Sequence, residues 1–160
     1  MKINITLNGV PRTITTEPGE NVRHLLAREG IMSMRNGCDA QGVCGACAII
    51  LNGKVVNSCL LVAPQIDGKE IITVDSLATH RSLSPVQSAM VDAGIVQCGY
   101  CTPAMELAIA DLLEREENPT RGQVQDALSG NLCRCGTYPQ HTIAVMETAD
   151  KLKARNRAEE

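Results

Sequence analysis

The stretch GNLCRCGTYPQ, residues 130–140, leaves one residue between Cys133 and Cys135, and VQCGYCTPAM, residues 96–105, leaves two between Cys98 and Cys101. Closely spaced cysteine pairs occur in disulfide frameworks, in zinc sites and around iron–sulfur clusters. The remainder of the chain has to discriminate among these three arrangements.

Composition excludes several classes of protein. A chain of 160 residues, 44% hydrophobic and 21% charged, fits one ordinary globular domain or two small ones. A net charge of −3 gives no electrostatic reason to bind nucleic acid or an anionic membrane. No stretch approaches the roughly 20 apolar residues of a membrane span. Because the N-terminus also carries no apolar signal core, we expect a cytoplasmic protein that starts near Met1.

The first 75 residues are typical of a small mixed sheet. Apolar residues alternate with polar ones from Ile3 to Leu7, the type I′ turn dipeptide Asn8-Gly9 follows, and PRTITT returns. Next come a helix from Asn21 to about Glu29, a Gly- and Cys-rich loop over 37–47, two strands around Asn52-Gly53, and a last strand in KEIITVDSL, residues 69–77. This order suggests a β-grasp architecture.

Beyond a linker over 76–84 the periodicity becomes helical. Helix starts are indicated by Ser84-Pro85, Thr102-Pro103, a capping box of Thr120 with Gln123, and Pro139, the last helix reaching about Arg155. We therefore predict an α+β protein with a β-grasp domain over 1–75, a linker over 76–84 and an all-α four-helix domain over 85–160.

The first half holds one set of four cysteines with the pattern C-x5-C-x2-C-x11-C, namely Cys38, Cys44, Cys47 and Cys59. Plant-type [2Fe–2S] ferredoxins use a related spacing. The glycines of the loop, Gly37, Gly42 and Gly45, let the backbone wrap closely around a cluster and direct N–H groups at its sulfides. Such hydrogen bonds stabilise the reduced, more negative state.

The second half holds the other set, Cys98, Cys101, Cys133 and Cys135. Each pair precedes a predicted helix, and we expect all four thiols at one junction of the helices. A helix N-terminus offers partial positive charge and free N–H donors, which suit an anionic cluster. Arg134 can offset further negative charge or serve at an interface.

The alternatives fit less well. Disulfides are disfavoured because the chain has no secretory signal, and zinc is disfavoured because its paired ligands usually have two to four residues between them. Both tyrosines, Tyr100 and Tyr138, lie beside cysteines, where their rings could shield a prosthetic group. The histidines, His24, His80 and His141, suggest no catalytic pairing by their spacing. We therefore favour two [2Fe–2S] clusters and a chain that passes electrons without transforming a substrate itself.

Three motifs together, NGCDAQGVCGACAIILNGKVVNSC (36–59), VQCGYCTPAM (96–105) and GNLCRCGTYPQ (130–140), resemble the small iron–sulfur subunit of the molybdenum hydroxylases, the xanthine oxidase family. The resemblance covers Lys2 to about Lys151. It implies a plant-type ferredoxin-like domain followed by a four-helix [2Fe–2S]-binding domain. It also implies a large partner subunit that carries a molybdenum–pterin cofactor and the substrate site.

Further roles follow from the same resemblance. The cluster of the second set would be the inner one, near the molybdenum cofactor, with Gln97 hydrogen bonded to its pterin and Cys135 lying against it. The cluster of the first set would be the outer one and would face a FAD subunit or another acceptor. Electrons would leave the molybdenum centre through the inner and then the outer cluster.

The chain departs from the family pattern at three places. Five residues separate Cys38 from Cys44 where four are expected, Ala104 replaces a frequent Gly, and Gly136-Thr137 reverses the usual Thr-Gly order. The reversed order is similar to that of flavin-free members such as isoquinoline oxidoreductase. A free-standing two-cluster carrier or redox sensor, and a reductive enzyme such as hydroxybenzoyl-CoA reductase, are the rival interpretations.

Overall fold

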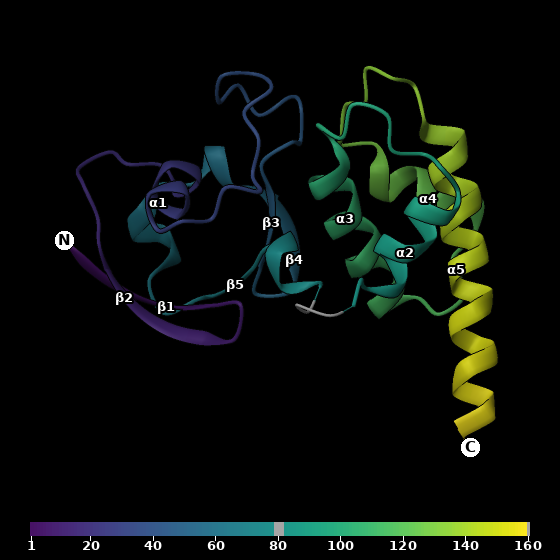
Figure 1. Ribbon diagram of the computed structural model, residues 1–160. Helices are drawn as coiled ribbons and strands as arrows, with labels where there is room; N and C mark the ends of the chain where they lie inside the picture. Colours follow the sequence, from purple (N-terminus) through teal and green to yellow (C-terminus); the bar gives the residue numbers. More distant parts are fainter. Residues whose placement is uncertain (79–81, 160) are drawn as a thin grey trace.

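The computed structural model describes residues 1–78 and 82–159, with side chains to Lys153. Within that part the chain forms a small mixed sheet with one helix, followed by four further helices that lie beside it (Figure 1). The described helices include none with the length and hydropathy needed to cross a membrane. Residues 79–81 of the predicted linker and His80 with them lie outside the described part.

The sheet has the strand order β2-β1-β5-β3-β4. Its strands are β1 (Lys2–Leu7), β2 (Val10–Thr15), β3 (Ala48–Leu51), β4 (Lys54–Asn57) and β5 (Glu70–Ile72). β1 and β5 are parallel, whereas β1–β2, β3–β4 and β3–β5 are antiparallel. Both predicted hairpin turns are confirmed, since φ is positive at Asn8-Gly9 and at Asn52-Gly53, as a type I′ turn requires.

Helix α1 (Val22–Arg28) covers the sheet, and Asn21 caps it by accepting a hydrogen bond from the His24 N–H at 2.9 Å. The core between them is aliphatic and includes Ile3, Ile5, Leu25, Leu26, Ile49 and Ile71. Three 3₁₀ turns, Ser58–Leu60, Ala63–Ile66 and Val74–Ser76, connect the remaining segments.

The predicted last strand, residues 69–77, is too long, because the strand ends at Ile72. Polar side chains in the next turn bond locally: the Thr73 hydroxyl donates to Asp75 at 2.8 Å and the Ser76 hydroxyl donates to the Thr73 carbonyl at 2.8 Å. Such local bonds compete with a sheet ladder and favour a turn.

The helices of the second half are α2 (Pro85–Asp92), α3 (Thr102–Arg115), α4 (Arg121–Leu128) and α5 (Tyr138–Glu159). The predicted caps are confirmed, since the Ser84 hydroxyl accepts from the Gln87 N–H at 3.2 Å and the Thr120 hydroxyl accepts from the Gln123 N–H at 3.3 Å. α5 runs past Arg155, because no Gly or Pro occurs between 140 and 159 to end it.

Strand β3 is buried on both faces and joins the two units. Ile49 points into the core of the sheet unit, while Ala48 and Ile50 are buried on the other face, outside that core. Helix α3 contacts β3 and β4 (Figure 1), and its face with Leu107 is buried outside the helical core. This packing fixes the position of the cysteine loop that precedes β3 relative to the cysteine loop that precedes α3.

Candidate metal centre

All eight cysteines are free thiols, and the fold brings them together in pairs. In the first set Cys38 contacts Cys44 and Cys59 contacts Cys47. In the second set the Cys98 and Cys135 sulfurs lie 3.6 Å apart, while Cys101 contacts Cys133. Every predicted ligand therefore lies beside another member of its own set.

Pairing in this form suits a dinuclear centre. In a [2Fe–2S] cluster held by four cysteines each iron takes two thiolates, whereas a structural zinc draws four ligands around one point. Among the described residues no group of three or more His, Cys, Asp or Glu side chains is arranged to hold a metal ion. Four thiols in two pairs are the donor set that a [2Fe–2S] cluster takes, with two thiolates for each iron.

Backbone N–H groups surround the sulfur of Cys38, as the Gly-rich loop predicts. Hydrogen bonds from the Cys44 thiol and from the N–H groups of Cys44, Val43 and Gly42 lower the pKa of Cys38 to about 7. Burial and the neighbouring Cys47 raise the pKa of Cys59 to about 11. The loop thus stabilises a negatively charged sulfur at Cys38, the least buried cysteine of the first set.

The second set likewise contains one thiol with a raised pKa beside one with a lowered pKa. Burial and the thiol of Cys133 raise the pKa of Cys101 to about 12. For Cys133 burial acts in the opposite direction to hydrogen bonds from the Thr137 hydroxyl and N–H, and the hydrogen bonds prevail, lowering its pKa to about 7. α3 begins directly after Cys101 and α5 directly after Thr137, so two helix N-termini face this set, as predicted.

Within the described part of the chain, three hydrogen bonds connect the loops that carry the two sets. The Leu132 N–H donates to the Cys44 carbonyl at 2.9 Å, the Asn131 side-chain amide donates to the Gly45 carbonyl at 3.0 Å, and the Asn36 N–H donates to the Tyr100 hydroxyl at 3.2 Å. Each joins the sheet unit to the helical unit.

Sequence reasoning missed Asn131 and Leu132, whose only signal is their place just before Cys133. It also predicted Gly45 only as part of the cysteine loop and not as part of the contact between the two units. A Cβ at Gly45 would lie 2.1 Å from the Gly130 carbonyl oxygen of the helical unit. Gly45 therefore serves the contact between units as well as the loop.

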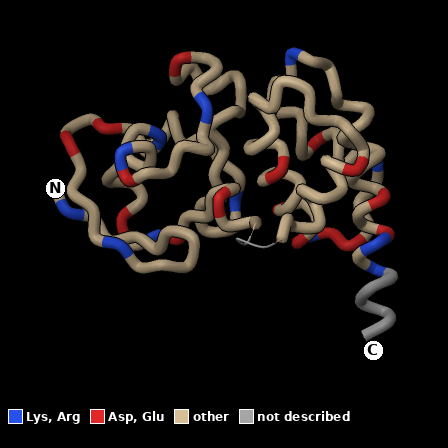
Figure 2. The backbone as a smooth tube through the Cα atoms, in the orientation of Figure 1, with Lys and Arg blue, Asp and Glu red and all other residues tan. Residues whose placement is uncertain are grey.

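A cavity of about 380 Å³ lies between the two sets, lined by Gly37, Cys44, Ala46, Cys98, Tyr100, Cys101, Leu132, Cys133 and Arg134. The loops that carry the cysteines lie at one end of both units and hold few charges (Figure 2).

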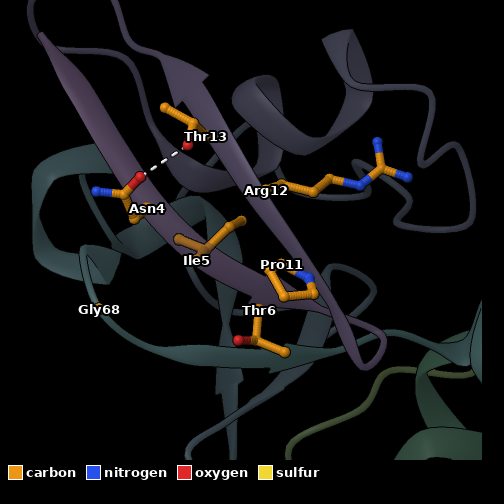
Figure 3. Close-up of a pocket in the computed structure, with 7 residues that line it drawn as sticks. All are labelled: Asn4, Ile5, Thr6, Pro11, Arg12, Thr13 and Gly68. Carbon is orange, nitrogen blue, oxygen red and sulfur yellow. Dashed lines mark hydrogen bonds between the residues drawn. The ribbon is translucent and has the colours of Figure 1, made fainter.

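A second cavity, of about 290 Å³, lies on the β1–β2 hairpin around Asn4, Arg12 and Thr13 and contains no cysteine (Figure 3).

The surface beside the second set combines apolar side chains with Gln97 and the exposed Arg134. Gln97 and Cys98 are exposed in the loop before α3, Cys135 is half-buried, and Val96, Tyr100 and Leu132 are exposed around them. Beside the first set Val43 and Leu60 are exposed.

Comparison with known proteins supports this description. A family model for a 2Fe-2S iron-sulfur cluster binding domain matches residues 5–78, and one for a [2Fe-2S] binding domain matches residues 73–146. The chain is 41% identical over 150 residues to the nicotinate dehydrogenase small FeS subunit of Eubacterium barkeri, covering 93% of this chain and 95% of that subunit. The chain belongs to the small iron–sulfur subunits of the molybdenum hydroxylase family.

Other members of this family are fused into longer proteins. The chain is 48% identical over 141 residues to the probable hypoxanthine oxidase XdhD of Escherichia coli K12, and the match covers 88% of this chain but 15% of that protein. Among solved structures, quinoline 2-oxidoreductase from Pseudomonas putida 86 superposes with a TM-score of 0.90 at 35% identity, covering 98% of this chain and 96% of the matched chain. The family resemblance of the cysteine motifs is thereby confirmed.

Proposed function

We propose that this chain is the electron-transfer subunit of a molybdenum-dependent hydroxylase or dehydrogenase. The observation that carries the proposal is the pairing of eight thiols into two sets whose loops are hydrogen bonded to each other. In this proposal residues 1–75 are a β-grasp, plant-type ferredoxin-like domain, 76–84 a linker, and 85–160 a four-helix [2Fe–2S]-binding domain.

The ligand assignment follows the pairs. Cys38 with Cys44 and Cys47 with Cys59 would hold the two irons of the outer cluster. Cys98 with Cys135 and Cys101 with Cys133 would hold those of the inner cluster. When bound, the two [2Fe–2S] clusters supply one-electron transfer.

The chain's own residues set the spacing and the medium between the two sites. The hydrogen bond from the Leu132 N–H to the Cys44 carbonyl joins an outer ligand to the residue before the inner ligand Cys133. Covalent bonds and this one hydrogen bond therefore form a short path between Cys44 and Cys133. Ala46 and Tyr100 line the space between the sets.

Partners follow from the two exposed surfaces. The surface with Val96, Gln97 and Cys135 suits a large subunit that carries the molybdenum–pterin cofactor, with Gln97 and Cys135 as contacts of that cofactor. The surface with Val43 and Leu60 suits a FAD subunit or another acceptor. The complex is then a hetero-oligomer, and its many reduced thiols suit a cytoplasmic location.

The test is the metal content of the complex that co-purifies with this chain from its native host. About four irons per chain, two for each cluster, with about one molybdenum are expected. Four irons on a lone chain without molybdenum would point to a free-standing carrier or redox sensor and would overturn the proposal. Zinc in place of iron would overturn the ligand assignment as well.

A pair of variants separates the two sites. Cys98→Ser is expected to remove the inner cluster's EPR signal and to leave the outer one, and Cys47→Ser to do the reverse. Two intact signals in either variant would contradict the assignment. Turnover of candidate substrates in both directions would then separate a hydroxylase from a reductive enzyme such as hydroxybenzoyl-CoA reductase.

A further inference from the structure

The hydroxyl of Thr137 lies on the sulfur of one cysteine of the second set. Its Oγ1 is 3.3 Å from the Cys133 sulfur, and the Thr137 side chain is buried, with 4% of the residue exposed. The bond is therefore shielded from competing water.

The start of α5 lacks one of the N–H groups that the hydroxyl of a preceding threonine can accept from. Thr137 immediately precedes α5, where a threonine hydroxyl normally accepts from the second or third N–H of the helix. The second position is Pro139, which has no N–H. The Thr137 hydroxyl contacts the Cys133 sulfur, and its O–H stays available to donate there whether or not its oxygen also accepts a hydrogen bond.

His141 fixes Thr137 in place. The Thr137 carbonyl accepts from the His141 N–H at 3.0 Å and lies 2.6 Å from the ring Nδ1. His141 itself is 2% exposed, so the ring is locked within the helical unit. His141 thus holds the Thr137 carbonyl with both its backbone N–H and its ring, while burial limits the movement of the Thr137 side chain.

The direction of the hydrogen bond follows from the state of the ligand. A thiolate bound to iron carries no proton, so the hydroxyl of Thr137 has to donate. Reduction adds negative charge to the cluster and its ligands, and hydrogen bonds to the sulfurs stabilise that state. We propose that Thr137 raises the reduction potential of the inner cluster by donating a hydrogen bond from its hydroxyl to the sulfur of Cys133.

This inference rests on the proposed ligation of the inner cluster by Cys133. Thr137 acts as a positioning residue, through Cys133, and its contribution depends on the order Gly136-Thr137. A Gly at 137 would leave the sulfur without the hydroxyl, so family members with the usual Thr-Gly order are expected to lack this hydrogen bond.

The experiment is a redox titration of the intact complex, followed by EPR of both clusters. Thr137→Val keeps the shape and the backbone N–H but removes the hydroxyl. We expect the equilibrium constant for one-electron reduction of the inner cluster to fall about tenfold, which corresponds to about 59 mV. The outer cluster in the same sample serves as an internal reference and is expected not to move.

Two further variants make the result specific. Thr137→Ser keeps the hydroxyl and is expected to retain the wild-type potential. Thr142→Val is a matched control, because the equally buried Thr142 hydroxyl donates to the Tyr138 carbonyl at 3.0 Å rather than to a sulfur. It is expected to leave both potentials unchanged.

An unchanged inner potential in Thr137→Val would overturn the inference, as would an equal shift in Thr137→Ser, which would assign the effect to packing. If Thr137→Val does not assemble the inner cluster, Thr137→Ala replaces it. Failure of both with normal assembly and potential in Thr137→Ser would support the role of the hydroxyl, and failure of all three would overturn it. Absence of an inner cluster from the wild-type protein would instead reject the proposed function.

Discussion

At the scale of single residues, His141 places a polar ring inside the helical unit. Its Nδ1 is 2.6 Å from the Thr137 carbonyl oxygen, while its Nε2 is buried without a hydrogen-bond partner. A neutral imidazole with its proton on Nδ1 satisfies this geometry. Burial accordingly lowers the pKa of His141 below the ordinary value of 6.5, against the hydrogen bond to Thr137, which raises it.

A dependence of stability on pH follows from this lowered pKa. Below about pH 6.5 a histidine in the unfolded chain takes up a proton that the folded protein resists, so the unfolded state binds more protons. Stability contributed by neutral His141 is therefore present above pH 6.5 and falls as the pH is lowered. The free energy of unfolding should drop more between pH 7.5 and 5.5 in the wild type than in His141→Gln. Equal drops, measured by urea denaturation of both proteins, would contradict this account.

At the scale of elements, α3 has two buried faces. Met105 and Ile109 point into the helical core, whereas Ala104, Leu107 and Asp111 are buried outside it. The three latter positions recur every three or four residues and so share one face of the helix. Since α3 contacts β3, whose Ala48 and Ile50 are also buried outside the sheet core, these faces meet. Small side chains on both sides allow a close approach.

A substitution on each face of α3 tests this division. Leu107→Ala and Leu112→Ala should each cost about 2–5 kcal/mol of stability through the cavity they leave. Only Leu107→Ala should also loosen β3, because Leu112 belongs to the helical core. Hydrogen exchange of peptides that cover β3 and α3 measures the difference. Equal protection of β3 in the two variants would show that Leu107 does not hold the sheet unit.

At the scale of the whole molecule, the two units meet where the two cysteine sets lie. The Gly45 backbone lies close to the helical unit, since its φ is +68° and a Cβ added to it would clash with the Gly130 carbonyl oxygen. Gly53 makes a suitable control, since its φ of +75° is similar and an added Cβ would meet nothing within 4 Å.

The cost of a methyl group at these two glycines should differ. Both Gly→Ala variants force an L-residue into the left-handed region, at about 1–2 kcal/mol. Gly45→Ala also overpacks the contact between the units, which typically adds about 1–3 kcal/mol. We expect Gly45→Ala to be less stable than Gly53→Ala in urea denaturation and to shift the EPR signals of both clusters. Identical stabilities and spectra would argue against a shared joint at Gly45.

The local features of this protein follow from short stretches of its sequence. Hairpin turns at Asn-Gly and helix caps at Ser84 and Thr120 depend on neighbouring residues, so local patterns predict them. The family likewise follows from motifs that lie within short segments. The extent of β5 and the end of α5 were predicted less well, because strand and helix ends depend on competing hydrogen bonds.

Which thiols pair, and how the two sets meet, depends on long-range packing. Cys98 lies beside Cys135 and Cys101 beside Cys133 because α3 and α5 bring distant segments together. The bond from the Leu132 N–H to the Cys44 carbonyl joins residues from different units. Contacts of this kind depend on the packing of α3 against β3, a long-range arrangement that no local pattern of residue types encodes.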